Sequence, residues 1–363
     1  MTRRSLLLSL PAVAAARRLM AQSGPSSIRV KALNHVGLAV TDPKRTIEFY
    51  QGLFGMPVQA RQGATALLRI GSGPQFLAVS PVGANQTPSL THYCLSVDGF
   101  NVDAILKTLA AHGVTKADEA GTTGAGQGSG GSLSGGPMKV RVRMRGPDAG
   151  GAKGGTPEIY VGDQDGIVVQ LQDAKYCGGS GSLGESCAAT EPAPKRGLLT
   201  LSDLSHVTIF AADGARSNKF YQDLFGLSIR SYQGPTAPTL AVGPDVQFVM
   251  FAGGGGGARG GGATPAPARQ ASINHLCMNM RSFSPDPILK TLETFGIKPR
   301  ESAQGPAGPM RSYVSMRMEN RGGAKEGTPE LYFTDPDGLL MQLQDTSYCG
   351  GAGVLGNICP PVS

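Results

Sequence analysis

Four histidines occupy matching positions in two copies of an internal duplication, and imidazole is a side chain that binds metal ions and transfers protons near neutral pH. His35 in Leu-Asn-His-Val corresponds to His206 in Leu-Ser-His-Val, and His92 in Thr-His-Tyr-Cys corresponds to His275 in Asn-His-Leu-Cys. The chain has only 5 histidines, so four matched positions favour a shared chemical task. Histidines that only pack a core are the alternative.

The duplication sets the domain organisation. Residues 150–187 and 322–359 align without a gap, and 24 of these 38 positions are identical. We therefore expect one domain over residues 28–187 and a second over residues 200–359, each long enough to bury a core of its own. Residues 188–199 contain prolines that favour extended backbone, and they are expected to form the linker.

The histidines lie on segments that alternate between apolar and polar side chains, which is typical of half-buried strands. Val36, Leu38 and Val40 would point to one face, and His35 to the other. The same pattern surrounds His275, where Leu276, Met278 and Met280 form the apolar face. The histidines are thus predicted to face away from the helices that cover each sheet.

Helices are predicted after each histidine strand. Asp42-Pro43 is a helix start and Gly55 a stop, and residues 220–226 repeat this second signal as Phe-Tyr-Gln-Asp-Leu-Phe-Gly. Further helices are expected around residues 105–109 and 288–292. The fifth histidine, His112, ends such a helix and is replaced by Phe295 in the other copy, so no chemistry is assigned to it.

An oxygen donor completes each set. Gln170 and Gln342 lie on the last strand of their copy and alternate with apolar residues, so they too face the polar side. Two imidazoles and one amide oxygen are a metal-site composition, and three protein donors leave positions open for water or substrate.

These motifs together resemble the vicinal oxygen chelate superfamily, which includes glyoxalase I, extradiol dioxygenases and bleomycin resistance proteins. The resemblance rests on a histidine in a first strand, a Phe-Tyr…Leu-Phe-Gly helix, a second histidine strand and a closing Tyr-x-x-Asp-Pro-Asp-Gly segment, and it covers both domains. It implies an α+β fold of tandem βαβββ modules, with U-shaped mixed sheets and outer helices. It also implies a divalent metal ion (Fe, Mn, Ni or Zn) bound by His35, His92 and Gln170, and by His206, His275 and Gln342.

The closing ligand in this superfamily is usually glutamate, whereas both copies here carry glutamine. Loss of a carboxylate charge should weaken metal binding and make the bound ion a stronger Lewis acid. A degenerate, empty site is the alternative interpretation.

Two further pairs of residues are candidates for catalysis. Tyr160 and Tyr332 resemble the tyrosine that helps to bind or protonate substrate in extradiol enzymes, although packing would also explain them. Glu158 and Glu330 share the strand face of these tyrosines and are predicted to act as a base or as the missing carboxylate ligand; an exposed or helix-capping role is the alternative.

The N-terminal segment and the cysteines indicate export. Residues 1–21 carry Arg3-Arg4 before a short apolar stretch and resemble a cleaved twin-arginine signal, with an uncleaved anchor as the alternative. Cys177 and Cys187 repeat the spacing of Cys349 and Cys359, which in an oxidising compartment favours one disulfide loop per domain over a zinc site. A periplasmic or secreted location is expected.

The composition of the chain indicates which kinds of partner it can bind. The formal charge of +7 includes four arginines of the leader, which leaves about +3 after its removal. No basic cluster with interleaved aromatics is present, so nucleic-acid binding is not expected, and no segment after the leader is long and apolar enough to span a membrane. The expected partner is a small oxygenated molecule, with a phenolic compound as the leading candidate. A metal-dependent enzyme is the leading hypothesis, and a non-catalytic protein that sequesters a small molecule is the other.

Replacement of Arg3 and Arg4 by lysine should block export, because the twin arginines are the feature that the export machinery is expected to read. The measurement is the distribution of the full-length and processed chains between cytoplasm and periplasm. Undiminished export of the double variant would contradict this prediction.

Overall fold

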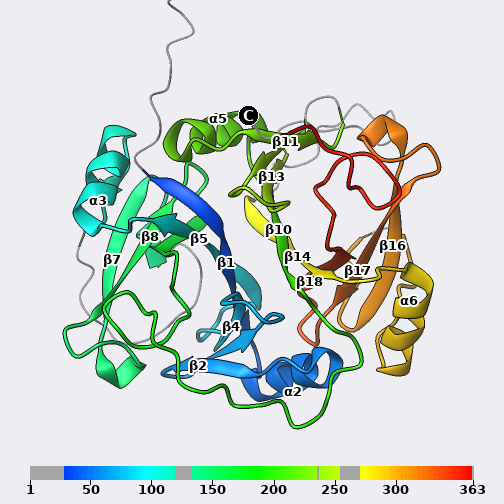
Figure 1. Ribbon diagram of the computed structural model, residues 1–363, viewed down its shortest axis with the longest axis horizontal. Helices are drawn as coiled ribbons and strands as arrows, with labels where there is room; N and C mark the ends of the chain where they lie inside the picture. Colours follow the sequence, from blue (N-terminus) through cyan, green and yellow to red (C-terminus); the bar gives the residue numbers. More distant parts are fainter. Residues whose placement is uncertain (1–27, 119–132, 235–236, 254–269, 304, 362–363) are drawn as a thin grey trace, which may run out of the picture.

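The computed structural model describes residues 28–118, 133–234, 237–253, 270–303 and 305–361. Within these ranges, the described part of each half forms one nine-stranded mixed sheet accompanied by α-helices and a short 3-10 helix, which confirms the predicted α+β modules (Figure 1). The proposed leader, residues 1–21, lies outside the described residues, as do most of the glycine-rich segments at 121–136 and 253–269. Within the described part of the chain, no helix has the length and apolar character needed to cross a membrane.

The two modules repeat the same order of elements. Module 1 contains β1 (Arg29–Val40), α2 (Pro43–Phe54), β2 (Val58–Gln62), β3 (Thr65–Arg69), β4 (Phe76–Pro81), β5 (Ser89–Asp98), α3 (Val102–Ala111), β6 (Thr115–Lys116), β7 (Lys139–Arg145), η1 (Pro147–Ala149), β8 (Thr156–Gly162) and β9 (Val168–Asp173). Module 2 contains β10 (Asp203–Phe210), α5 (Gly214–Phe225), β11 (Ile229–Tyr232), β12 (Pro238–Ala241), β13 (Phe248–Ala252), β14 (Ser272–Met280), α6 (Pro285–Thr294), β15 (Lys298–Pro299), β16 (Arg311–Arg317), η2 (Glu319–Arg321), β17 (Thr328–Thr334) and β18 (Leu340–Asp345).

Strand order is identical in the two sheets. The first sheet runs β2-β3-β4-β1-β5-β9-β8-β7-β6, and the second runs β11-β12-β13-β10-β14-β18-β17-β16-β15. The two histidine strands, β1 and β5, are therefore central neighbours, and the glutamine strand β9 follows β5 directly.

Helix α2 begins and ends where its sequence signals predict. The Asp42 side chain accepts a hydrogen bond from the backbone N–H of Arg45, Pro43 occupies the first turn, and Gly55 ends the helix with φ 66° in the left-handed region. Helix α5 repeats the arrangement with Asp213 as its N-cap and Gly226, with φ 65°, as its stop.

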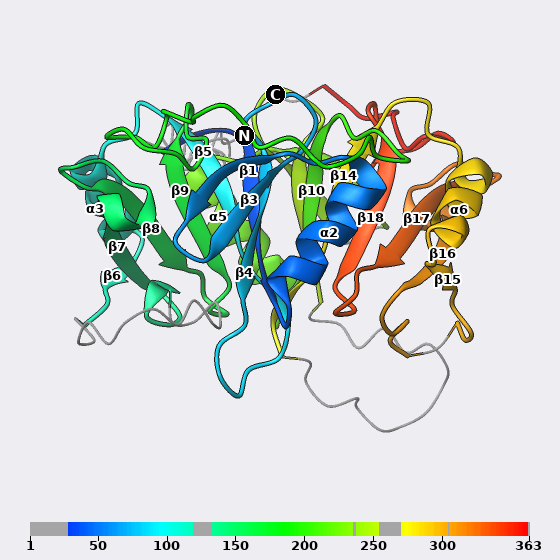
Figure 2. The same ribbon diagram turned by 90° about the horizontal axis from the view of Figure 1, so that it is seen from below.

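Each of these helices also packs against the other module. Phe54 of α2 lies 5.9 Å from Phe333 of β17, measured between ring centroids, and Phe49 lies 5.6 Å from Phe295, which follows α6. One continuous apolar cluster extends through both modules as a result. The expectation of two separate cores is wrong in this respect, because the sequence repeat shows the helix but not the sheet that covers it. Figures 1 and 2 show α2 and α5 at the junction of the two halves.

Two glutamines join the central strands across this junction. The amide of Gln75 donates to the carbonyl of Leu33 (2.8 Å) and accepts from the N–H of Leu204 (2.8 Å). Gln247 makes the reciprocal pair, accepting from the Leu33 N–H and donating to the Leu204 carbonyl. Strands β1 and β10 lie side by side here, and the glutamines satisfy backbone groups that would otherwise be buried without partners.

The Asp-x-Asp-Gly turns form a second set of contacts between modules. Asp163 accepts a hydrogen bond from the hydroxyl of Tyr221 in α5 (3.2 Å), and Asp165 pairs with Arg216 at the start of the same helix. In the symmetric contact, Asp337 pairs with Arg45 of α2 at 2.6 Å. These turns thus hold the helix that the other module contributes.

The predicted disulfides are both present, Cys177–Cys187 and Cys349–Cys359. The first loop bridges the two ends of its sheet, because the carbonyl of Gly178 accepts from Gln62 of β2 and that of Gly179 accepts from Arg145 of β7. Since six strands lie between β2 and β7 in the sheet order, the sheet must curve to bring both strands to one loop.

Asp163→Asn should stabilise the protein relative to wild type as the pH rises. Burial raises the pKa of Asp163 to about 6, above the unfolded value of about 3.9, so the folded state favours the protonated form. The contribution of this group to stability is present below about pH 4 and is lost as the pH rises through about 6. Asparagine retains an acceptor for the backbone N–H groups of Asp165 and Ile167 without titrating.

The difference in the free energy of unfolding between variant and wild type should therefore move in favour of the variant by roughly 2 kcal/mol between pH 4 and pH 7. Urea denaturation at a series of pH values measures it. A constant difference across this range would contradict the burial argument.

Candidate functional site

Four neighbouring strands bring the predicted site residues of module 1 together. Across β1 and β5, Gly37 lies opposite His92 and His35 lies opposite Cys94. Cys94 in turn lies opposite Gln170 of β9, and Gln170 lies opposite Tyr160 of β8. Cross-strand partners share a face of the sheet. We call the face that carries these residues the polar face; the opposite face is apolar and packs in the shared core.

The three candidate ligands of module 1 converge at short range. The Nε2 atom of His35 lies 2.9 Å from Oε1 of Gln170 and 3.3 Å from Nε2 of His92. Both histidine rings are largely buried, and Phe76 stacks on His35 with ring centroids 4.3 Å apart. Residues that are far apart in the chain thus present three nitrogen and oxygen atoms to one point.

A hydrogen-bond network fixes the tautomer of His35. The amide nitrogen of Asn34 donates to the carbonyl of Tyr176 (2.9 Å), so the Asn34 Oδ1 atom faces Nδ1 of His35 at 2.7 Å. Because this oxygen can only accept, Nδ1 of His35 carries the proton and Nε2 presents its lone pair to the ligand set.

A glycine allows His92 to approach. A Cβ atom added to Gly37 would lie 2.3 Å from Cε1 of His92, so the imidazole occupies the space of the missing side chain. Thr208 stands opposite His275 at the equivalent position of module 2. The second histidine of each pair therefore lies opposite glycine in module 1 and opposite threonine in module 2, which changes the space available to its imidazole.

Module 2 contains the equivalent candidate ligands, and two of their buried atoms have no hydrogen-bond partner. Nε2 of His206 lies 3.1 Å from Oε1 of Gln342, and Nδ1 of His275 donates to Asn274 Oδ1 at 2.8 Å. This leaves Nε2 of His275 as an acceptor, and it is buried without a hydrogen-bond partner, as is the Nε2 atom of Gln342. Unsatisfied buried polar atoms are costly and are unusual outside functional sites.

All four imidazoles are neutral near pH 7. Burial lowers the pKa of His92 and of His275 to about 4. Burial, together with the neighbouring histidine, holds the pKa of His35 and His206 well below the usual value. Neutral imidazole is the form that binds a metal ion.

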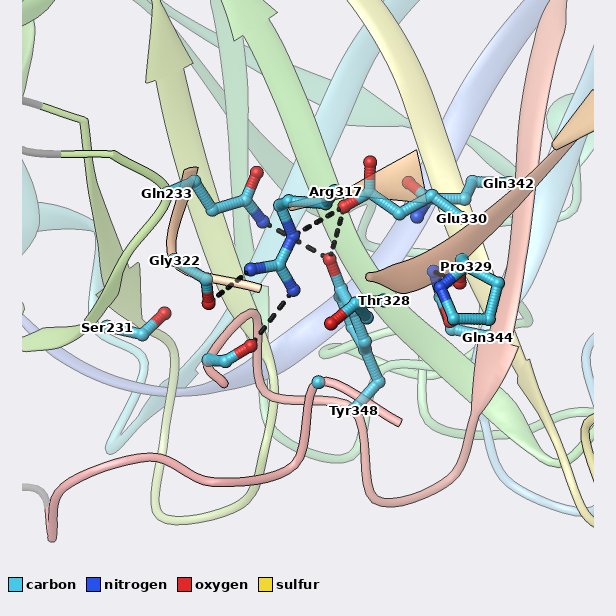
Figure 3. Close-up of polar contacts among 12 residues, drawn as sticks. Ser231, Gln233, Arg317, Gly322, Thr328, Pro329, Glu330, Gln342, Gln344 and Tyr348 are labelled. Atoms are coloured by element: carbon cyan, nitrogen blue, oxygen red, sulfur yellow. Dashed lines mark hydrogen bonds and ion pairs between the residues drawn. The ribbon is translucent and has the colours of Figure 1, made fainter. Parts of the chain in front are cut away.

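A buried ion pair lies beside each ligand set. Nε of Arg317 donates to Oε1 of Glu330 at 2.8 Å, and its other nitrogens donate to the carbonyls of Gly322 (2.7 Å) and Gly351 (3.0 Å) (Figure 3). Arg145 and Glu158 form the same pair in module 1 at 2.7 Å. Both partners are almost completely buried in each module.

The ion pair in turn positions two tyrosines. Glu330 accepts from the hydroxyl of Tyr348 (3.1 Å), which Figure 3 shows, and from that of Tyr332 (3.3 Å). In module 1 the corresponding donors are Tyr176 and Tyr160, each at 3.1 Å from Glu158. The rings of Tyr160 and Tyr332 meet His92 and His275 edge to face, with centroids 5.8 and 5.4 Å apart.

These contacts give Glu158 and Glu330 a structural task that the sequence interpretation did not foresee. Each carboxylate is already occupied by an arginine and two tyrosines, so its use as a base or metal ligand would require leaving a buried ion pair. An exposed or helix-capping position is also wrong, since both are buried.

Sequence reasoning missed the partners of the site. Arg145 and Arg317 follow methionine in both copies, at the same offset and only five residues before the aligned segments, so extending the alignment would have found them. Tyr176 and Tyr348 lie within the repeat, but their positions next to Cys177 and Cys349 do not indicate a contact with a glutamate. Asn34 and Asn274 carried no signal, because the equivalent residues in the other copy are Ser205 and Thr91.

Two other structural features bear on the site. Within the described ranges, no group of three or more His, Cys, Asp or Glu side chains is arranged to hold a metal ion, so glutamine is indispensable to either candidate set. A cavity of about 1260 Å³ lies beneath the linker, lined by residues that include Arg69, Lys195 and Leu198, and it contains none of the candidate ligands.

Comparison with known proteins agrees with this architecture. Residues 32–132 match the family model of the Glyoxalase/Bleomycin resistance protein/Dioxygenase superfamily, and residues 204–237 match that of the Bleomycin resistance protein-like N-terminal domain. A search of curated protein sequences finds no match.

Several solved structures share the fold over most of their length. The 2,3-dioxygenase LapB from Pseudomonas sp. KL28 is 12% identical with a TM-score of 0.54, covering 92% of this chain and 94% of that one. Homoprotocatechuate 2,3-dioxygenase from Brevibacterium fuscum, in complex with 3,4-dihydroxyphenylacetate, is 15% identical with a TM-score of 0.51, covering 88% and 82%. The Mn(II)-bound glyoxalase from Novosphingobium aromaticivorans is 15% identical with a TM-score of 0.50, covering 87% and 82%.

The fold and the paired polar faces define a two-module protein of the glyoxalase and dioxygenase type. The family models that match part of each module, together with the fold, support the vicinal oxygen chelate superfamily that the motifs predicted.

Arg317→Met should lower the free energy of unfolding by about 3–5 kcal/mol, because it leaves the Glu330 carboxylate buried without its cation. Adding Glu330→Gln should recover much of that loss. Urea denaturation measures both effects. As a control, Glu301→Gln removes the 82% exposed partner of Arg311 and should cost less than about 1 kcal/mol. Equal losses in the single and double variants would contradict this assignment.

Proposed function

We propose that this protein is an exported, metal-dependent enzyme that acts on a small oxygenated substrate, with a phenolic compound as the leading candidate. The observation that carries the proposal is the convergence of buried, neutral acceptor atoms from His206, His275 and Gln342, repeated in His35, His92 and Gln170. Export rests on the twin-arginine motif and is supported by the two disulfides.

The donor atoms fit a divalent metal ion. Metal–nitrogen and metal–oxygen bonds of about 2.1 Å place adjacent ligand atoms roughly 2.9–3.4 Å apart. The distances from His35 Nε2 to Gln170 Oε1 and to His92 Nε2 are 2.9 and 3.3 Å. An ion would also give the unpaired Nε2 of His275 a partner. This fit favours a bound ion over a degenerate, empty site.

The types of donor atom favour some metal ions over others. Imidazole and amide oxygen suit Fe, Mn, Ni or Zn better than Ca. When bound, such an ion supplies a Lewis acid with open positions for two adjacent oxygens of a substrate. Because all three protein ligands are neutral, the ion would retain its full charge toward the substrate.

The tyrosines beside the ligand histidines would contact the substrate and orient it. Tyr160 and Tyr332 lie against the ligand histidines, and burial together with the glutamate charge raises the pKa of each hydroxyl well above its usual value. They would therefore remain protonated. Each hydroxyl has a single hydrogen, which it donates to Glu158 or Glu330, so its oxygen lone pairs would accept a hydrogen bond from a substrate hydroxyl, and donation to a substrate oxygen would require the hydroxyl to turn away from the glutamate. Oxygenase-type chemistry on a phenolic compound ranks ahead of lyase or isomerase chemistry because the tyrosine and the open ligand count both favour it.

A non-catalytic protein that sequesters a small molecule is the second candidate. Two observations favour it, the match of residues 204–237 to a bleomycin resistance-like domain and the absence of a carboxylate ligand. Under this hypothesis the same polar face binds a ligand without turnover.

Elemental analysis should find about two divalent ions per chain if both sites bind metal. His275→Ala should remove about one, because it deletes a ligand of module 2, and addition of His92→Ala should remove the other. Gln342→Glu should tighten binding at module 2, since it returns a negative charge to the ion. The matched control is His112→Ala, which changes an exposed histidine at the end of α3 and should leave the metal content unchanged.

Folded wild-type protein that stays metal-free after reconstitution with Fe, Mn, Ni and Zn salts would contradict the enzyme proposal. Binding of a small phenolic ligand by that metal-free protein would favour sequestration.

A further inference from the structure

The polar faces of the two modules differ in charge along one strand. In β7, Arg141, Arg143 and Arg145 alternate, and the equivalent positions of β16 are Tyr313, Ser315 and Arg317. Arg143 lies opposite Glu158 and Ser315 lies opposite Glu330, which places both on the polar face. Since Arg145 already pairs with Glu158, module 1 carries cationic charge here that module 2 lacks.

Arg143 lies next to the candidate ligand set. Its guanidinium carbon is 5.9 Å from the ring centroid of Tyr160, and that ring is 5.8 Å from the ring of His92. Among the described residues, no carboxylate forms an ion pair with Arg143, and the side chain is half-buried.

In module 2 an aromatic stack covers the corresponding tyrosine, and Tyr313 of this stack is the equivalent of Arg141. Tyr332 packs face to face on Tyr313 with centroids 5.1 Å apart, and Arg300 covers Tyr313 at 4.5 Å. One ring therefore separates this cation from Tyr332, and the side chain of Ser315 is neutral. The surface beside His275 is suited to an uncharged ring rather than to an anion.

We infer that the two modules select ligands of different charge: module 1 binds a carboxylate-bearing oxygenated molecule through Arg143, and module 2 favours a neutral one. The inference rests on the proposed metal site. A guanidinium forms paired, charge-assisted hydrogen bonds with a carboxylate, and a partly desolvated position strengthens them. Three neutral ligands would add to this preference, because an anion also neutralises the charge of the bound ion.

The test compares two probes that differ only by a carboxylate, 3,4-dihydroxybenzoate and catechol. Calorimetric titration of metal-loaded protein without oxygen would measure affinity without turnover. The His275→Ala background confines binding to module 1. In that background, Arg143→Ser should weaken binding of the acid by roughly 10- to 100-fold and leave catechol unchanged, and Arg143→Lys should retain part of the affinity. On the otherwise wild-type chain, Ser315→Arg should add affinity for the acid at module 2.

The metal content of each sample separates the two possible failures. Loss of metal binding in the wild-type protein would overturn the proposed function. Metal-loaded protein that prefers catechol at module 1, binds neither probe, or keeps its affinity for the acid after Arg143→Ser would overturn the charge selection alone. Circular dichroism verifies that each variant is folded, and Ser315→Arg tests the inference without the His275 substitution.

Discussion

The buried arginine–glutamate pair is the interaction on which each polar face depends. A carboxylate that is removed from water must be neutralised and hydrogen-bonded, and Glu330 receives Arg317 and two tyrosine hydroxyls. The same guanidinium holds the carbonyl of Gly351 in the disulfide loop. One ion pair thus fixes β16, β17 and the loop together, and the tyrosine beside the candidate ligands takes its position from them. The Arg145–Glu158 pair repeats this arrangement.

The disulfide loop of module 1 extends this constraint to a ligand. Tyr176 directly precedes this loop, and its carbonyl orients Asn34, which in turn fixes the tautomer of His35. On the opposite face of each sheet, apolar side chains pack together with helices α2 and α5 in one core. The two candidate sites therefore lie on opposite sides of one apolar cluster that contains residues of both modules.

Duplication has produced two related but unequal sites. Gly37 admits His92 where Thr208 stands opposite His275, and the asparagine that orients a histidine precedes His35 in one module and His275 in the other. Arg143 and Ser315 extend the difference to charge. The scaffold of ion pair, tyrosines and disulfide is the same in both modules, so these few residues account for the differences around the ligand atoms.

The sequence alone was sufficient to predict the internal repeat, the polar and apolar faces of the strands and the ends of the helices. Each depends on local chemistry: alternation places His35 and Gln170 on a polar face, Asp42 and Gly55 cap a helix, and equal spacing predicted the cysteine pairs. The motifs also identified the superfamily, since they recur at fixed positions in both copies. The tertiary structure was needed to show which charged side chains form ion pairs and which sheet each helix covers. The occupation of Glu158 by Arg145, the contact of α2 with β17 and the opposition of Gly37 and His92 all join segments that no periodicity links. Such contacts follow from the curvature and register of the sheets, which depend on the packing of the whole chain.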